Sequence, residues 1–330
     1  MIVAQRIFQY GSVCSGIEAA TAAWHDLGWK PSFFSEIEAF PRAVLKHHYP
    51  DTPLHGDFTT IKGNEYEPID LLVGGTPCQS FSVAGLRGGL ADDRGNLALE
   101  FLRLAKRTRP RWLVWENVPG VLSSNGGRDF GSILGGMVEL GYGVAYRTLD
   151  AQYFGVAQRR RRVFVVGYLG DWRRAAAVLF ERHSLQGHSA PRREKGERVA
   201  DTFTVGANQC SGFPGDITEV SVSMSLNAKG GSGRMDAESE TLIACDVVHT
   251  LRALSKLETY VAHTLQVRRL TPRECERLQG FPDDYTAISW RGKPARDCPD
   301  GPRYKALGNS MAVPVMRWIG QRIQMVDNIS

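Results

Sequence analysis

Short apolar runs alternate with segments of helical periodicity over residues 7–167, and this alternation limits the fold more than any other feature of the chain. It is typical of an α/β domain, in which helices cover both faces of a mostly parallel sheet. We therefore expect a doubly wound, Rossmann-like domain. The expected strands are residues 7–13, 32–35, 69–73, 112–115, 143–149 and 163–168, and the expected helices between them are residues 19–27, 40–48, 97–107 and 131–140.

The texture of the chain changes after residue 169, where glycine, serine, threonine and short β-branched pieces replace the helical periodicity. Helical character returns at residues 271–279, which begin with a typical Thr-Pro start, and at residues 310–326. The sequence thus predicts a larger domain formed by residues 1–169 and 267–330, and a smaller, irregular, β-rich domain formed by residues 170–266. We expect the last helix to pack back onto the larger domain.

Composition disfavours several classes of protein. No apolar run approaches the 18 residues of a membrane span, and the first twenty residues lack the basic and apolar regions of a secretory signal. The six cysteines are dispersed and form no C-x-x-C pair, which disfavours a zinc site and a disulfide framework. We therefore expect a cytoplasmic protein with free thiols and no bound metal.

Positive charge is concentrated in one stretch of the chain. The formal net charge is +5, and residues 158–198 contain eleven arginines and lysines against four acidic residues. A solvated loop is one interpretation of this stretch. Contact with the phosphate backbone of a nucleic acid is the other.

Cys78 follows a predicted strand. The segment LLVGGTPCQSFS, residues 71–82, runs from an apolar strand through two glycines into Pro77 and Cys78. Ligands of an open parallel sheet bind beyond the carboxyl ends of the strands, so Cys78 lies where a nucleophile is useful. A lone cysteine is most often a buried structural thiol, but polar neighbours on a glycine-rich loop favour the nucleophile.

An acidic residue ends the next strand. In WLVWENVPG, residues 112–120, Glu116 is carried to the same edge of the sheet as Cys78. A single glutamate is commonly a helix cap or a surface acid. Beside Cys78 it becomes a candidate general acid.

Four arginines begin the last predicted strand. In QRRRRVF, residues 158–164, side chains alternate with period two, so one face carries Gln158, Arg160 and Arg162 and the other carries Arg159 and Arg161. A run of arginines is normally solvated. At the start of a central strand, we expect one of the two sets to face a site.

The ordered motifs P-C-Q, E-N-V and Q-x-R-x-R resemble those of the cytosine-C5 DNA methyltransferase family of bacterial or phage type, and the similarity runs from about residue 7 to residue 322. The resemblance implies methyl transfer from S-adenosyl-L-methionine to C5 of a flipped-out cytosine. It also implies that Cys78 adds to C6, that Glu116 stabilises N3, and that Arg160 and Arg162 bind the ring oxygen or position the nucleophile. The residues that it places at the base are Pro77, Gln79, Asn117 and Gln158.

The resemblance also implies a cofactor loop in GSVCSGIE, residues 11–18, where Gly16 would let the backbone approach the cofactor. This loop departs from the common family pattern at Cys14, where an aromatic residue is frequent, and at Glu18, where a second glycine is frequent. The implied cofactor-binding residues of the loop are Cys14, Ser15, Gly16 and Ile17.

Further cofactor residues follow from other matched positions. Glu36 would hold the ribose hydroxyls, and Asp57 would contact the adenine amino group. The segment ALGNSMAVP, residues 306–314, matches the family's final motif near the methionine part of the cofactor, and residues 269–282 match a capped scaffold helix. The full set implied outside the loop is Glu36, Ile37, Asp57, Phe58, Asn309 and Ser310.

The resemblance implies double-stranded DNA as the substrate, with base readout by residues 170–266, which are rich in Ser, Thr, Asn, Gln and Arg. We expect a monomer. Three biological settings remain open: a partner of a cognate restriction endonuclease, a solitary host methylase and a phage-borne enzyme. One branch of the family methylates cytosine in transfer RNA and is an alternative, although the size of the lobe favours DNA. A non-catalytic DNA-binding relative is a second alternative, but it would be expected to lack Cys78 or Glu116.

Overall fold

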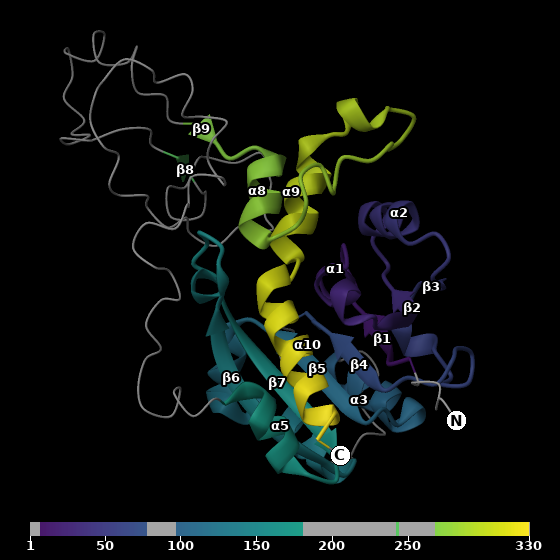
Figure 1. Ribbon diagram of the computed structural model, residues 1–330, viewed down its shortest axis with the longest axis vertical. Helices are drawn as coiled ribbons and strands as arrows, with labels where there is room; N and C mark the ends of the chain where they lie inside the picture. The colour runs from purple at the N-terminus through teal and green to yellow at the C-terminus, as the bar shows by residue number, and fades with distance from the viewer. Residues whose placement is uncertain (1–6, 78–96, 181–241, 244–267, 330) are drawn as a thin grey trace, which may run out of the picture.

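The computed structural model describes residues 7–77, 97–180, 242–243 and 268–329, and its centre is a seven-stranded sheet with the strand order β3-β2-β1-β4-β5-β7-β6 (Figure 1). Strands β3, β2, β1, β4 and β5 are parallel, and β7 runs antiparallel to both β5 and β6. The strands are β1 (Gln9–Val13), β2 (Lys30–Ser35), β3 (Leu54–His55), β4 (Leu71–Gly74), β5 (Trp112–Asn117), β6 (Tyr142–Asp150) and β7 (Arg161–Leu169).

The antiparallel pair β6–β7 is a feature that the sequence analysis did not anticipate. Parallel neighbours need a long crossover, usually a helix, whereas a short connection returns the chain in the opposite direction. Only the short η6 (Ala151–Phe154) lies between β6 and β7, so β7 runs back beside its predecessor. The expected α/β fold is confirmed, with this change at one side of the sheet.

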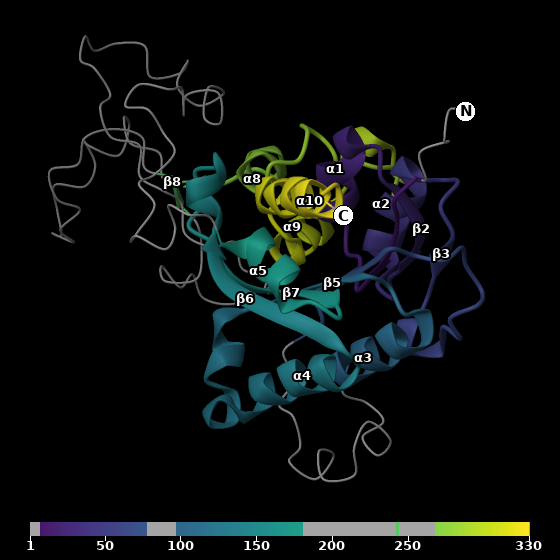
Figure 2. The same ribbon diagram turned by 60° about the horizontal axis from the view of Figure 1, so that its bottom comes forward.

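Helices cover both faces of the sheet, as Figure 2 shows: α3 and α4 lie on one face, and α1, α5 and α10 lie on the other. Side chains of β5 alternate between these layers, with Trp112 and Val114 in one core and Leu113 and Trp115 in the other. The helices are α1 (Ala19–Trp24), α2 (Ala39–His48), α3 (Leu97–Thr108), α4 (Arg128–Glu139), α5 (Trp172–Leu179), α8 (Pro272–Gln279), α9 (Asp300–Asn309) and α10 (Val313–Asp327), with short 3₁₀ turns η1 (His25–Leu27), η2 (Phe58–Thr60), η4 (Pro119–Leu122), η5 (Ser124–Gly127) and η8 (Ala295–Asp297).

The end of the chain packs back onto its beginning, as the sequence predicts. Helix α10 lies against α1, and the indole Nε1 of Trp24 donates a 2.7 Å hydrogen bond to the carbonyl of Met316. Helix α8 begins with the expected Thr271 cap, in which the hydroxyl and the Glu274 carboxylate satisfy each other's backbone N–H groups. Helix α9 was not predicted.

The start of the expected smaller domain lies with the sheet. Helix α5 packs against β6, β7 and α10, and its entry at Asp171 and Trp172 passes directly over Gly143. Residues 181–241 and 244–267 lie outside the described residues, so the irregular β-rich domain stays a prediction. From that region, β8 (Leu242–Ile243) pairs with β9 (Arg268–Arg269).

None of the helices in the described ranges is long and apolar enough to cross a membrane. In the same ranges, no group of three or more His, Cys, Asp or Glu side chains is arranged to hold a metal ion.

Candidate active site

Glu116 is the last residue but one of β5, at the carboxyl edge of the sheet. It follows Trp112 and Val114 with period two, so its side chain lies on the face that α10 covers. Its exposure is only 9%, and its carboxylate lies 3.1 Å from the Nε of Arg162. Gly75, at the end of the neighbouring β4, leaves room for this carboxyl, because a Cβ there would approach Glu116 Oε2 to 2.9 Å.

The alternation expected for the arginine run is confirmed. Gln158 and Arg160 are buried and Arg162 is partly buried, whereas Arg159 and Arg161 are exposed. Strand β7 carries Arg162 to Glu116 by pairing antiparallel with β5.

Arg160, immediately before the start of β7, bonds to the C-terminal segment. Its Nη2 donates to the carbonyls of Gly308, at 3.0 Å, and Ser310, at 2.7 Å. Its Nε and Nη1 find no partner in the described part of the protein, and neither do the amide nitrogen and oxygen of the fully buried Gln158. Buried polar groups without partners are uncommon, so these atoms are candidates to bind a ligand.

Burial controls the proton affinity of Glu116. Desolvation raises the pKa of its carboxyl above the usual value, and the charges of Arg162 and Arg160 oppose this effect only in part. Burial and the neighbouring Arg162 lower the pKa of Arg160, while Glu116 raises it. The site therefore combines a carboxyl that retains its proton more readily than a surface glutamate with two fixed guanidinium groups.

Asn117 fixes the segment that leads to Cys78. Its amide nitrogen donates a 3.0 Å bond to the carbonyl of Thr76, and its oxygen accepts from the N–H of Val118. The Trp115 indole also donates to the Thr76 hydroxyl, at 2.9 Å. The chain thus passes Glu116 and emerges at the exposed Pro77. Cys78 and Gln79, predicted at the base, lie outside the described residues.

The predicted cofactor loop crosses the carboxyl ends of β1 and β2. Gly16 adopts a left-handed backbone (φ +56°) with nothing within 4 Å of the place that a Cβ would occupy. Its N–H donates a 2.8 Å bond to the carboxylate of Glu36, which also accepts from the N–H of Glu38. Ser15 closes the loop, because its N–H bonds to the carbonyl of Ser35 and its hydroxyl bonds back to Ser12.

The remaining predicted cofactor residues differ in exposure. Ile37 is 71% exposed, whereas Ile17 and Phe58 are buried in the core. Asp57 is exposed and caps η2, and burial raises the pKa of the Cys14 thiol to about 12, with Glu36 and Asp57 adding to the shift. Asn309 is exposed at the end of α9, and the following Ser310 is buried.

A narrow pocket brings several of these residues together, with a volume of about 30 Å³. From the predicted set, Cys14, Ser15, Gly16, Glu116, Asn309 and Ser310 line it. The cofactor loop, the candidate acid and the final motif therefore line the same pocket. Sequence reasoning did not assign Glu18, Gly75 or Met311 to the site, although all three line this pocket. The glycine pair at the end of β4 could have pointed to Gly75, and the departure from the family pattern could have pointed to Glu18.

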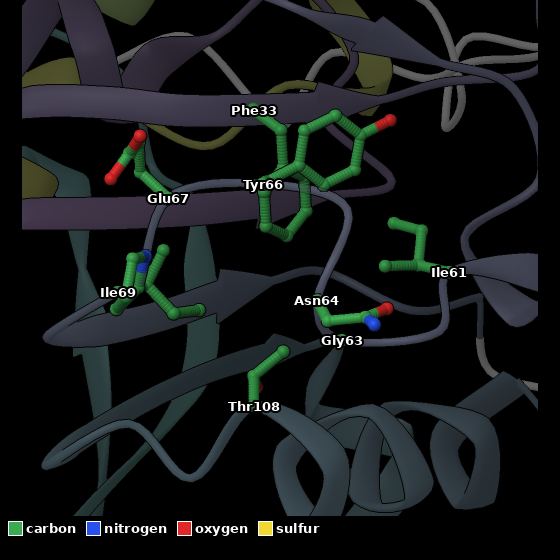
Figure 3. A pocket seen from close by; sticks show the side chains of 9 residues that line it. Phe33, Ile61, Gly63, Asn64, Tyr66, Glu67, Ile69 and Thr108 are labelled. Atoms are coloured by element: carbon green, nitrogen blue, oxygen red, sulfur yellow. The ribbon is translucent and has the colours of Figure 1, made fainter.

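A larger hollow of about 480 Å³ lies elsewhere, between β2, residues 61–69 and the end of α3 (Figure 3). Its walls include Tyr66, whose ring stacks on Phe33 with centroids 4.7 Å apart. None of the predicted site residues lines it. Size alone thus does not identify the site in this protein.

Comparison with known proteins finds one family model that matches most of the chain and relatives whose names differ. The model of the C-5 cytosine-specific DNA methylase family matches residues 8–325. A "DNA N-6-adenine-methyltransferase" of Escherichia phage P1 is 37% identical over 95% of this chain, which spans 61% of that relative's length. The "Type II methyltransferase M1.ScrFI" of Lactococcus lactis subsp. cremoris is 32% identical over 89% of this chain and 72% of its own length.

Solved structures share the fold at low sequence identity. The S. pombe Dnmt2 methyltransferase superimposes with a TM-score of 0.70 and 18% identity, covering 97% of this chain and 99% of that one. This likeness supports the arrangement of sheet and helices described above.

Proposed function

Because the chain belongs to the C-5 cytosine-specific DNA methylase family, we propose that it transfers a methyl group from S-adenosyl-L-methionine to C5 of a flipped-out cytosine in double-stranded DNA. One observation carries the proposal. The buried carboxyl of Glu116 lies against Arg162, and the adjoining Asn117 bonds to the carbonyl of Thr76, two residues before Cys78 in the sequence.

The chemistry of cytosine requires this combination. C5 is a poor nucleophile, and addition of the Cys78 thiolate to C6 moves electron density through N3 to C5. Glu116, whose burial favours the protonated form, stabilises the charge that develops at N3, and Arg162 holds the ring oxygen. Once the methyl group has been transferred to C5, a base removes the C5 proton. The electron pair of that C–H bond restores the C5–C6 double bond as the Cys78 thiolate leaves C6.

The residues at the carboxyl edge fit the proposed cofactor. When bound, S-adenosyl-L-methionine supplies an electrophilic methyl group. The open space at Gly16 admits a ligand against the backbone, and the exposed Ile37 offers an apolar surface for a purine. Glu36 would hold the ribose hydroxyls, while Asn309 and Ser310 would hold the methionine end.

Two further arginines suit the phosphate backbone of DNA. Arg159 and Arg161 are exposed at the same edge as Glu116, and neither forms an ion pair within the described residues. Their alternation with Gln158 and Arg160 directs them away from the buried site. We assign them to phosphate contacts near the target base, and assign sequence readout to residues 181–266.

Two other substrates define the competing functions. The name of the phage P1 relative suggests methylation of the adenine N6 amino group. An exocyclic nitrogen has its own lone pair and needs no thiol addition, so the presence of Cys78 directly after Pro77 in the sequence favours cytosine. Cytosine in transfer RNA is the second competitor, because the same ring chemistry would serve.

A mechanism-based trap separates these functions. Sequencing after bisulfite treatment of DNA from cells that express the protein first identifies the target. DNA with 5-fluorocytosine at that target should then hold the enzyme covalently, because fluorine cannot leave C5 as a cation. The adduct should survive denaturation and map to Cys78 by peptide mass analysis. Methylated adenine without an adduct would show that the protein methylates the N6 amino group instead. An adduct with RNA alone would show that its substrate is cytosine in RNA.

A further inference from the structure

Glu18 combines two unfavourable features in the wall of the narrow pocket. Its backbone lies in the left-handed region (φ 62°, ψ 62°), which disfavours residues other than glycine. Its side chain is also almost fully buried, with 1% exposure, where an ionised carboxylate loses its hydration. A glycine would avoid both penalties, which indicates that the side chain has a use at this position.

Hydrogen bonds hold the carboxylate in place. Ser12 at the end of β1 donates its hydroxyl to Oε1, and Thr21 in α1 donates its N–H, at 3.0 Å, and its hydroxyl, at 2.5 Å, to Oε2. Behind them, the Ser15 hydroxyl lies 3.1 Å from that of Ser12, and the Tyr10 hydroxyl lies 2.8 Å from that of Thr21. The hydroxyls of Ser12 and Thr21 both donate to Glu18, and the hydroxyl of Tyr10 can donate to that of Thr21, an arrangement that suits the ionised form.

The carboxylate has donors but no counter-charge. Burial raises the pKa of Glu18 and the bonds from Ser12 and Thr21 oppose it, with no lysine, arginine or histidine of the described residues contributing. Buried charges are normally paired. The described residues that line the pocket with Glu18, among them Gly16 and Glu116, include no cation, so a positively charged ligand could supply the counter-charge.

We propose that Glu18 is a specificity-determining residue whose carboxylate is the counter-charge for the sulfonium of S-adenosyl-L-methionine, so that the pocket favours this cationic donor over the neutral thioether S-adenosyl-L-homocysteine left after transfer. This inference rests on the proposed function. The two molecules share the adenosine, the carboxylate and the amino group of the amino acid. They differ only in the methyl group and its positive charge, so the ratio of their affinities isolates the role of charge.

Equilibrium binding to the full chain by calorimetry provides the test. Glu18→Gln keeps the shape but removes the charge; its amide oxygen can still accept from Thr21, and its amide nitrogen can donate to the Ser12 hydroxyl. At low salt and mildly alkaline pH, we expect the preference for S-adenosyl-L-methionine over S-adenosyl-L-homocysteine to fall about tenfold in this variant. Asp26→Asn, an exposed substitution on the adjoining η1, should leave the ratio unchanged.

The outcomes distinguish this inference from the function on which it rests. Equal weakening of both ligands would reduce Glu18 to a structural cap, and an unchanged ratio would mean that it carries no charge; either result overturns the inference. Wild-type protein that binds neither ligand would contradict the proposed function itself. If thermal melting shows that Glu18→Gln does not fold, Glu18→Asp is measured in its place, because aspartate keeps the carboxylate. A wild-type ratio of the two affinities in this variant supports the role of the charge, and loss of the preference for S-adenosyl-L-methionine refutes it.

Discussion

Among single residues, Glu116 and Glu18 show how the position of a carboxyl in the fold changes its proton affinity. Both are buried, and desolvation raises the pKa of each. Glu116 has Arg162 as an ion-pair partner, whereas Glu18 has neutral hydrogen-bond donors. The first suits proton sharing with a base, and the second suits attraction of a cation.

The raised pKa of Glu116 predicts how stability responds to pH. The folded chain holds this proton at pH values where the unfolded chain, with a pKa near 4.5, has lost it. Its contribution to stability is thus complete below that value and is lost as the pH rises through the raised pKa. Glu116→Gln cannot titrate. The free energy of unfolding of the variant minus that of the wild type should therefore increase with pH across this window, by up to ~1.4 kcal/mol per pH unit.

Urea denaturation of both proteins at a series of pH values measures this difference. The exposed Glu139→Gln at the end of α4 is the control for removal of a surface carboxylate. A difference between Glu116→Gln and wild type that is flat or decreases with pH would contradict the burial argument.

At the scale of elements, packing of α5 against the sheet extends the larger domain beyond residue 169. Gly143 in β6 lies under the first turn of this helix, so that a Cβ at Gly143 would approach the backbone nitrogen of Trp172 to 2.1 Å. The collision would be with backbone, which cannot move aside as a flexible side chain does. The helix can pack here because residue 143 is a glycine.

Paired glycine substitutions test this packing. Gly143→Ala should lower the free energy of unfolding by about 1–3 kcal/mol, because α5 must shift away from β6. Gly135→Ala, at an exposed position in α4 with no atom within 4 Å of the new Cβ, should raise it by about 0.5–1 kcal/mol. Chemical denaturation of both variants gives the two signs. A tolerated Gly143→Ala would show that α5 is not held at this place.

On the scale of the whole molecule, exposed arginines at the active edge should set how DNA binding depends on salt. Each phosphate contact releases counterions, so its loss reduces the slope of log K against log salt by about one. Arg159→Ala with Arg161→Ala should therefore reduce the slope by about two. Lys106→Ala with Arg107→Ala, which removes two exposed charges at the end of α3, should change it little. Equal slopes for both double variants in a fluorescence titration would argue against a role for Arg159 and Arg161.

Exchange of the expected smaller domain tests the proposal that this part of the chain reads DNA sequence. Because α5 packs with the sheet, the exchange should retain residues 170–180 and replace residues 181–266 with the corresponding segment of a relative. We expect the methylated sequence to change while methyl transfer persists, as bisulfite sequencing would report. A folded chimera with the original specificity would place base readout elsewhere.

The sequence by itself determined the features that depend on neighbours along the chain. The succession of strands and helices follows from hydrophobic period, the cap of α8 from Thr271 and Glu274, and the two faces of the arginine run from alternation in β7. The position of Glu116 at the end of a strand follows in the same way. Each of these is a local pattern that the backbone geometry of a strand or helix repeats.

Only the tertiary structure decided the features that depend on residues far apart in the sequence. The antiparallel course of β7, the place of α5 and the bond from Asn117 to Thr76 arise from pairing and packing that no local period encodes. The burial that raises the pKa of Glu116 is collective in the same way. Glu18 is the clearest case: in the sequence it is a departure from a family pattern, and only folding buries this pocket-lining residue with no cationic partner among the described residues.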